Sequence, residues 1–434
     1  MELYDKYLAC GGVVATDSRT LKGGELFFAL KGENFDGNAY AMKALEAGAA
    51  YAVVNASADF PDDPRLIKVP DTFAALQELA IYHRENVKPG GALPVIGLTG
   101  TNGKTTTKEL VAAVLSKKFC VTATKGNFNN DIGVPLSLLS ITPETQIAVI
   151  EMGANHPDDI AKLVRVSRPD YGLITNVGKA HLLGFGSFEG VKAAKGELYK
   201  WLASRDGSVI FLNADDPDLT QMARECACHV WSYGIRYEGV EILPTDAEHP
   251  FLRLVIEGTT VETSLVGAYN ATNVLAAIAV GRYFGVPLAD AFAAISAYVP
   301  SNQRSQMLRT QRNTLIVDAY NANPSSMAVA LDNFLAMRSA RKLALLGEMR
   351  ELGEASAEEH LKLVRRLSEA GVDACFVGEE FGRALDAAGL DRARWYPDSV
   401  SLAAALSGDD SPSDTLILVK GSRGTKMETV IPSL

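Results

Sequence analysis

The sequence predicts an α/β protein built from three domains. Short apolar runs that end in small or polar residues alternate with stretches of helical periodicity, as is typical of parallel β-α-β units. This alternation is interrupted by the proline- and glycine-containing segment 86–94 and again near 298–306. We therefore expect a small N-terminal α/β domain at 1–91, a central domain with a mostly parallel sheet at 92–306, and a Rossmann-like C-terminal domain at 307–434.

The N-terminal domain is expected to mix short strands with turns and to end in a helix. The stretch GGELFFALKGENFDGNAYA (23–41) combines apolar pairs with glycine and asparagine turn signals. Between residues 73 and 80, phenylalanine, leucine and alanine recur at helical spacing, which predicts a helix over roughly Thr72 to Glu85.

The central and C-terminal domains each contain a series of candidate strands. In the central domain these are PVIGL (94–98), IAVIEMG (147–153), YGLITNVG (171–178) and GSVIFLNADD (207–216). In the C-terminal domain they are TLIVDAYNANP (314–324), RKLALLGEM (341–349), VDACFVG (372–378) and DTLILVKGSRG (414–424). Functional residues of open parallel sheets lie at the carboxyl ends of strands, and the central runs end in polar residues there.

Composition narrows the class of protein. The formal net charge of −10 argues against a nucleic-acid binder, which would need a basic face, although it allows a local basic pocket. We read neither a signal peptide nor an apolar run long enough to span a membrane. The five scattered cysteines fit a reducing compartment, so we expect a cytoplasmic protein.

The stretch VIGLTGTNGKTTTKEL (95–110) predicts a phosphate-binding loop. The usual motif has a glycine five residues before the GK glycine, a position that Leu98 occupies here. An apolar strand nevertheless leads into a glycine-rich turn, and a helix is expected to start at about Lys104, so backbone N–H groups can face phosphate oxygens. A glycine turn beside a surface lysine is the alternative, and the strand followed by GKT favours nucleotide binding. The predicted ATP-binding residues of the loop are Gly100, Thr101, Asn102, Gly103, Lys104, Thr105 and Thr106.

A phosphate loop alone does not distinguish a GTPase, a kinase, a motor and a ligase. TGTNGKTTT resembles the loop of the Mur ligase family, as do the stretches at 125–139, 151–160, 176–198 and 267–281. Within that family, DSRTLKGGELFFALKGENFDGNAYA (17–41), VDAYNANPSSM (317–327), LGEMRELGEASAEEH (346–360) and VKGSRGTKME (419–428) resemble the MurF type. The resemblance covers nearly the whole chain in the family's order.

The resemblance implies an ATP-dependent ligase of peptidoglycan precursor synthesis. ATP would phosphorylate the C-terminal carboxylate of UDP-N-acetylmuramoyl-tripeptide, and the amine of D-alanyl-D-alanine would attack the acyl phosphate to give the pentapeptide, ADP and phosphate. Two rivals are another amide ligase of the superfamily (MurE type or folylpolyglutamate synthase) and a P-loop ATPase without ligase activity. The third residue of the tripeptide, lysine or meso-diaminopimelate, stays open.

We expect the protein to be a monomer that binds no nucleic acid.

Two Mg²⁺ sites follow from the same resemblance. Glu151 ends an apolar strand, where a carboxylate can hold a hard cation, and the Thr105 hydroxyl is expected beside it. His181 and Lys195 would serve the second cation, with Lys195 carbamylated; aligning the family's lysine instead with Lys192 is the alternative. Carbamylation requires a lysine with a depressed pKa.

The resemblance also assigns residues to ATP and to the substrates. Asn270 and Asn273, three apart at a helix start and hence on one face, would lie at the adenine with Arg304 near the domain junction. With these, the expected catalytic residues are Lys104, His181, Lys195 and Asp318. The expected substrate-binding residues are Ser18, Arg19, Asn34, Asp36 and Gly37 for the UDP moiety, Asn129 and Asn130 for the sugar-nucleotide or phosphate, and Tyr320, Asn321, Asn323, Lys420 and Arg423 near ATP and the dipeptide.

Overall fold

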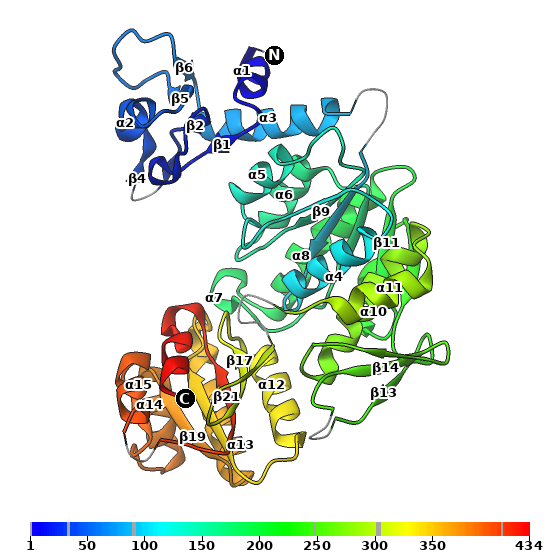
Figure 1. Ribbon diagram of the computed structural model, residues 1–434, viewed down its shortest axis with the longest axis vertical. Coiled ribbons are helices and arrows are strands. Elements are labelled where there is room, and N and C mark those ends of the chain that lie inside the picture. The colour runs from blue at the N-terminus through cyan, green and yellow to red at the C-terminus, as the bar shows by residue number, and fades with distance from the viewer. Residues whose placement is uncertain (1, 33–34, 89–92, 246–248, 301–304, 409–410) are drawn as a thin grey trace.

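The computed structural model describes most of the chain, namely residues 2–32, 35–88, 93–245, 249–300, 305–408 and 411–434. Three α/β units follow one another and form a crescent, with the first and last units at its tips and the central unit at its back (Figure 1). No helix in these ranges combines the length and the apolar character that crossing a membrane requires.

The N-terminal unit contains a four-stranded parallel sheet in the order β1-β2-β5-β6. Its strands are β1 (Val14–Ala15), β2 (Leu26–Phe28), β5 (Tyr51–Asn55) and β6 (Leu66–Val69), with a separate hairpin of β3 (Lys31–Gly32) and β4 (Phe35–Asp36). Its helical segments are α1 (Glu2–Ala9), α2 (Ala41–Glu46), α3 (Thr72–Asn86) and the short 3-10 turns η1 (Ser18–Thr20) and η2 (Gly37–Tyr40). Helix α3 confirms the helix predicted over 72–85, and the Asp71 carboxylate caps it by accepting from the N–H groups of Phe73 and Ala74.

The central unit is organised around a six-stranded, fully parallel sheet in the order β12-β11-β10-β7-β9-β8. The strands are β7 (Val95–Thr99), β8 (Val121–Ala123), β9 (Ile147–Glu151), β10 (Tyr171–Ile174), β11 (Val209–Asn213) and β12 (His229–Tyr233). The helices are α4 (Lys104–Leu115), α5 (Gly133–Leu139), α6 (Asp159–Ser167), α7 (Leu182–Phe185), α8 (Phe188–Ala203), α9 (Pro217–Arg224), η3 (Ala268–Asn270), α10 (Ala271–Tyr283) and α11 (Leu288–Ala297).

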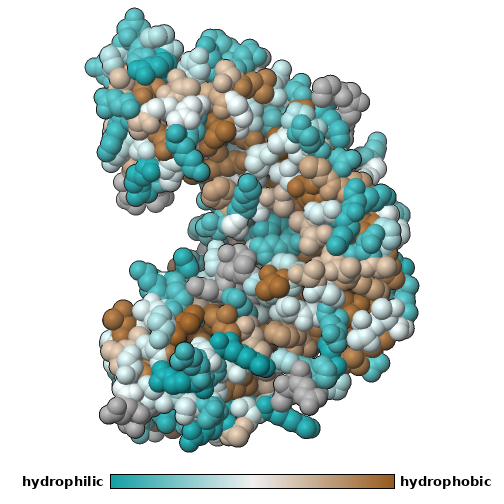
Figure 2. Space-filling view, in the orientation of Figure 1, coloured by the Kyte–Doolittle hydropathy of each residue, from teal (hydrophilic) through white to brown (hydrophobic). Residues whose placement is uncertain are grey.

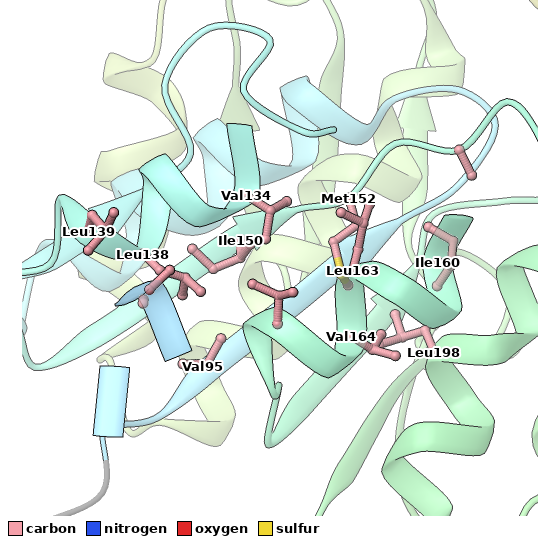
Figure 3. Close-up of a cluster of buried hydrophobic side chains, with 14 of the residues drawn as sticks. Val95, Val134, Leu138, Leu139, Ile150, Met152, Ile160, Leu163, Val164 and Leu198 are labelled. Carbon is pink, nitrogen blue, oxygen red and sulfur yellow. The ribbon is translucent and has the colours of Figure 1, made fainter. Parts of the chain in front are cut away.

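Helices cover both faces of this sheet, which is why its strands read as continuous apolar runs. Successive residues of β7 point to opposite faces: Val95 packs in the core beneath α5, α6 and α8, whereas Ile96 packs in the core beneath α4 and α10. Figure 3 shows the first of these cores, in which Leu138 of α5 lies near Ile150 of β9 and Leu163 of α6 lies near Met152.

Helix α3 fixes the N-terminal unit to the central unit. It packs against α5 and α6, and the buried Arg84 reaches across the junction. The Arg84 Nε donates to the carbonyl of Ser167 at 3.0 Å, and its Nη2 donates to the carbonyl of Arg168 at 2.7 Å and to Asp170 Oδ2 at 2.9 Å. These contacts, together with one apolar core shared by both units, hold them in a fixed relation.

A small antiparallel sheet follows the central strands and was not predicted from the sequence. It consists of β13 (Glu241–Leu243), β14 (Arg253–Ile256) and β15 (Thr259–Glu262). Each strand is only three or four residues long, too short for its alternation to stand out from a loop.

The C-terminal unit has a six-stranded sheet in the order β16-β17-β21-β18-β19-β20, parallel except for the edge strand β16. The strands are β16 (Gln306–Arg309), β17 (Thr314–Asp318), β18 (Lys342–Gly347), β19 (Asp373–Val377), β20 (Trp395–Tyr396) and β21 (Leu416–Lys420). The helical segments are α12 (Pro324–Ala336), η4 (Gly353–Ala355), α13 (Ser356–Glu369), α14 (Glu379–Ala388), α15 (Ser399–Leu406), η5 (Arg423–Thr425) and η6 (Met427–Ser433). The strands predicted in both α/β series and the mostly parallel sheets are thus confirmed.

Candidate active site

The carboxyl ends of the central strands open into a cavity of about 940 Å³ that the C-terminal unit also lines. Figure 2 shows a hollow on one side of the molecule, between the first and last units, with hydrophilic residues at its base. The predicted site residues that line the cavity are Thr101, Asn102, Gly103, Lys104, Thr106, Asn129, Asn130, Glu151, His181, Asn270, Asn273, Asp318, Tyr320, Asn321, Asn323 and Lys420.

The phosphate loop connects β7 to α4 through two glycines with positive φ. Gly100 has φ 147°, and a Cβ there would lie 1.9 Å from Thr175 Oγ1, so no larger residue fits without displacing that hydroxyl. Gly103 has φ 77° and precedes α4 without a side-chain cap. The first turn of α4 therefore presents backbone N–H groups that can bind an anion.

Asn176 lies two residues after the end of β10, next to Thr175. Its hydrogen bonds hold the phosphate loop in its conformation. Its backbone carbonyl accepts from the N–H of Thr101 at 3.0 Å, and its side-chain oxygen accepts from the N–H of Asn102 at 3.0 Å. The Lys104 ammonium folds back over the same loop and donates to the carbonyls of Gly100 at 2.8 Å and Thr101 at 3.1 Å. The sequence prediction did not include Asn176, although its place at a strand end within TNVGKAH was a usable signal.

Glu151, at the end of β9, lies beside the loop with one carboxylate oxygen unpaired. Its Oε1 accepts from Thr105 Oγ1 at 3.1 Å and from Asn129 Nδ2 at 2.9 Å. Its Oε2 is buried without a hydrogen-bond partner. A buried carboxylate normally finds partners, so this oxygen, with the Thr105 hydroxyl nearby, suits a hard divalent cation.

His181 lies at the wall of the cavity where the central and C-terminal units meet. Its backbone is left-handed (φ 50°), and its Nδ1 contacts Glu351 Oε2 of the C-terminal unit. Burial lowers the pKa of His181, against the opposing effect of Glu351, and so favours the neutral imidazole. A neutral imidazole nitrogen is a suitable metal ligand.

Lys195 lies on α8 and is 2% exposed. Burial, with the nearby charge of Lys104, lowers the pKa of Lys195 to about 7, and its ammonium lies 5.8 Å from the centre of the Phe185 ring. Lys192 is different: it donates to Asp218 Oδ1 at 2.8 Å, and this hydrogen bond raises its pKa. Of the two lysines considered for carbamylation, only Lys195 has the depressed pKa that the modification requires.

Asn270 and Asn273 meet on one face at the start of α10, as their spacing predicts. Asn273 Nδ2 donates to Asn270 Oδ1 at 2.8 Å, and Asn273 Oδ1 accepts from Thr107 Oγ1 of α4 at 3.0 Å. Next to them, the Tyr269 hydroxyl hydrogen bonds with Ser305 Oγ at 2.7 Å, and burial raises the Tyr269 pKa above its usual range. These side chains connect the phosphate-loop helix to the start of the C-terminal unit.

The C-terminal unit contributes charged and amide groups to the cavity. Lys420, 1% exposed at the end of β21, forms an ion pair with Asp318 at the end of the adjacent β17 and also donates to the carbonyl of Asn321 at 3.3 Å. Arg423 is mostly exposed and does not line the cavity; it pairs with Glu428 at 3.4 Å, and its guanidinium lies 5.7 Å from the centre of the ring of Tyr320, which does line it.

The predicted UDP-binding residues lie in the N-terminal unit, away from the cavity lining. Arg19 is exposed and pairs with Asp17 at 2.7 Å next to Ser18, and the Asp36 carboxylate caps η2. Gly37 packs so closely that a Cβ would lie 2.5 Å from the Leu30 carbonyl, which by itself explains a glycine there. Asn34 and Arg304 lie outside the described residues.

Three predicted site residues of the central unit do not line the cavity and are buried, namely Gly100, Thr105 and Lys195. Glu351 was missed by the sequence prediction, although it falls within the quoted stretch 346–360. Its contact with His181 joins residues 170 positions apart, and spacing along the chain gives no sign of it. The sequence analysis recognised the stretch 346–360 that contains Glu351, but it did not predict that Glu351 contacts His181.

Family models match the chain in three consecutive segments. They describe a Mur ligase family catalytic domain over residues 12–84, a Mur ligase middle domain over 98–281 and a Mur ligase glutamate ligase domain over 303–423. A curated relative from Bacillus subtilis (strain 168), named UDP-N-acetylmuramoyl-tripeptide–D-alanyl-D-alanine ligase, is 36% identical over 431 residues, which cover 97% of this chain and 92% of the relative.

Solved structures of MurF ligases are also similar to this chain over nearly its whole length. A crystal structure of MurF from Acinetobacter baumannii is 31% identical, covers 99% of this chain and 97% of its own, and superposes with a TM-score of 0.83. The MurF ligase from Thermotoga maritima in complex with ADP is 27% identical, covers 97% of this chain and 96% of its own, and has a TM-score of 0.81.

Proposed function

The chain belongs to the Mur ligase family, and we propose that it uses ATP to join D-alanyl-D-alanine to the C-terminal carboxylate of UDP-N-acetylmuramoyl-tripeptide in peptidoglycan precursor synthesis. Similarity to ligases of that name along almost the whole chain carries this proposal. The convergence of the phosphate loop, Glu151 and the asparagine pair on one cavity supports it. A P-loop ATPase without ligase activity would leave the similarity in the N- and C-terminal units unexplained.

Amide formation from a free carboxylate fails because the carboxylate is a poor electrophile and hydroxide a poor leaving group. Transfer of the γ-phosphoryl group of ATP to the tripeptide carboxylate gives an acyl phosphate and ADP. The dipeptide amine then attacks the acyl carbon, loses a proton and expels phosphate.

The first step, transfer of the γ-phosphoryl group, depends on positive charge placed beside the phosphates. Lys104 and the first-turn N–H groups of α4 supply it to the phosphates, and Asn270, Asn273 and Arg304 hold the nucleotide.

Two Mg²⁺ ions would complete this arrangement. Thr105 and Glu151 would hold the first, as the unpaired Glu151 oxygen suggests. His181 and a carbamylated Lys195 would hold the second. Held there, the ions would supply positive charge that offsets the negative charge of the transferred phosphoryl group. Because the pKa of Lys195 is lowered to about 7, its ammonium can lose one proton near neutral pH. The resulting amine would add to CO₂ and release a second proton, so that a buried cation would become an anionic oxygen ligand.

Substrate binding uses all three domains, whose proposed limits are 1–91, 92–306 and 307–434. The N-terminal domain holds the UDP moiety through Ser18, Arg19, Asn34, Asp36 and Gly37, and the tripeptide extends past Asn129 and Asn130 to Lys104. The residues of the C-terminal domain that act near ATP and the dipeptide are Asp318, Tyr320, Asn321, Asn323, Lys420 and Arg423.

We propose a monomeric, cytoplasmic enzyme, since ATP and UDP-linked precursors are available in the cytoplasm.

The test is phosphate release by purified protein with ATP, the UDP-linked tripeptide and D-alanyl-D-alanine, each omitted in turn. We expect release to require both co-substrates and to yield the pentapeptide, identified by mass. Supplying the lysine and the diaminopimelate tripeptide separately would identify the third residue. Release that ignores both co-substrates would refute the ligase assignment.

A further inference from the structure

The central and C-terminal units meet in a small contact beside the cavity. Leu183 donates its backbone N–H to the carbonyl of Glu351 at 3.2 Å, and His181 Nδ1 contacts the carboxylate of the same glutamate. Lys179 and Glu359 lie 3.9 Å apart in the same junction. One residue of the C-terminal unit, Glu351, therefore uses both its backbone and its side chain to hold the segment that carries His181.

Both partners of the contact have left-handed backbones. His181 has φ 50° and Glu351 has φ 63°, a region that residues other than glycine seldom adopt. Such conformations persist only where the surrounding structure imposes them, and they concentrate at functional sites. The two side chains are thus directed toward each other by the backbone on either side of the junction.

His360 braces the loop that carries Glu351. It is fully buried, and its Nε2 accepts from the N–H of Met349 at 2.9 Å while its Nδ1 lies 2.7 Å from the Ser356 carbonyl, to which it donates. Met349 and Ser356 lie on the two sides of Glu351 along the chain. The histidine therefore ties the ends of the loop together, so that Glu351 is presented from a fixed base.

The contact has the form of a carboxylate that orients a metal-binding histidine. When a carboxylate accepts from one ring nitrogen, the tautomer and the ring direction are set, and the other nitrogen keeps its lone pair for a cation. In His181, Nδ1 faces Glu351, which leaves Nε2 for a cation on the ring's other side, and His181 lines the cavity.

We propose that Glu351 is a positioning residue, which the C-terminal domain supplies to orient His181 toward the second cation. This inference rests on the proposed function, which assigns His181 to that cation. It follows that the second cation site is complete only while the C-terminal domain is docked as observed. Cation occupancy and domain arrangement are then coupled through a single carboxylate.

The test measures Mn²⁺ binding by electron paramagnetic resonance in full-length enzyme with a non-hydrolysable ATP analogue. We expect the unmodified protein to bind two Mn²⁺ ions. Glu351→Ala should bind the second ion about 10- to 100-fold more weakly, the usual effect of losing the partner of a metal-binding histidine. Glu351→Gln, whose amide oxygen can still accept from the ring N–H, should restore part of this affinity. The first ion should be unaffected.

Glu354→Ala is the matched control, because Glu354 is an exposed glutamate of the same loop. It should bind both ions as the unmodified protein does. Equal second-ion affinity in Glu351→Ala and Glu354→Ala, or a single Mn²⁺ ion in the unmodified protein, would overturn the inference. Pentapeptide formation in the same preparation tests the proposed function separately, so either can fail alone.

Discussion

The side-chain amide of Asn323 donates a hydrogen bond to the side-chain oxygen of Asn102 at 2.8 Å. Asn102 belongs to the phosphate loop, and Asn323 is the residue that caps α12 of the C-terminal domain. The Asn323 oxygen accepts from the N–H of Ser326 at 2.8 Å while its nitrogen reaches Asn102. One asparagine therefore begins a helix in one domain and contacts the nucleotide loop of another.

Two substitutions separate these roles. Asn323→Ser keeps a helix-capping oxygen but loses the contact with Asn102, whereas Asn323→Ala loses both. Of the two variants, only Asn323→Ala should lower the free energy of unfolding of the C-terminal domain, by about 1 kcal/mol, because only it loses the helix-capping oxygen. Both variants should lower kcat/KM for ligation by roughly 2- to 10-fold, the equivalent of one net hydrogen bond. Calorimetry and steady-state kinetics measure the two effects, and an Asn323→Ser variant that ligates normally would show that the contact does not serve catalysis.

The sequence predicted local features of this molecule well and contacts between domains poorly. The start of α4 at Lys104 and the meeting of Asn270 with Asn273 depend on periodicity and on three-residue spacing, both visible in the chain. The contacts of Asn323 with Asn102 and of Glu351 with His181 depend on how two domains dock. No local pattern encodes that arrangement, so only the motifs that contain these residues could be recognised.

The sequence also did not show how the pKa values of two candidate lysines differ. Lys192 and Lys195 stand three residues apart on one helix; the family resemblance assigned the carbamylated position to Lys195 by alignment and left Lys192 as the alternative. The structure buries Lys195 and pairs Lys192 with Asp218, which shifts their pKa values in opposite directions. Desolvation and neighbouring charges set these values, and both depend on the folded packing.

Carbamylation of Lys195 can be detected directly. We expect protein equilibrated with ¹³C-labelled bicarbonate to show a single carbamate resonance by NMR. The Lys195→Met variant should lose it, because this position has the only one of the two amines with a lowered pKa. The Lys192→Met variant should retain it, since the Lys192 amine is held protonated by Asp218. A resonance lost only in Lys192→Met would reverse the assignment.

His360 should make stability depend on pH. Burial lowers the pKa of His360 below its ordinary value of 6.5, so the unfolded chain takes up this proton first as the pH falls. The unfolded state then binds more protons than the native state, and stability decreases below about pH 6.5 until the folded pKa is reached.

The expected slope for this single group is at most about 1.4 kcal/mol per pH unit. Calorimetry of the unmodified protein and His360→Gln at pH 7 and pH 5.5 checks it: the unmodified protein should lose more stability between these values. His83, whose pKa burial also lowers, is present in both proteins and cancels in the comparison. Equal losses would mean that the folded protein binds this proton as readily as the unfolded chain does, and so that burial does not lower the pKa of His360.

Glu151 should make thermal stability respond to Mg²⁺. A ligand that binds only the folded state stabilises it by about 2.7 kcal/mol when its concentration is 100 times its Kd. With ADP present, Mg²⁺ should therefore raise the melting temperature of the unmodified protein. Glu151→Gln should lose most of this increase, because the amide that replaces the unpaired carboxylate oxygen carries no charge for the cation. Glu197→Gln, which changes a glutamate paired with Lys200 at 2.7 Å, should respond normally. An equal response in Glu151→Gln would place the cation elsewhere in the cavity.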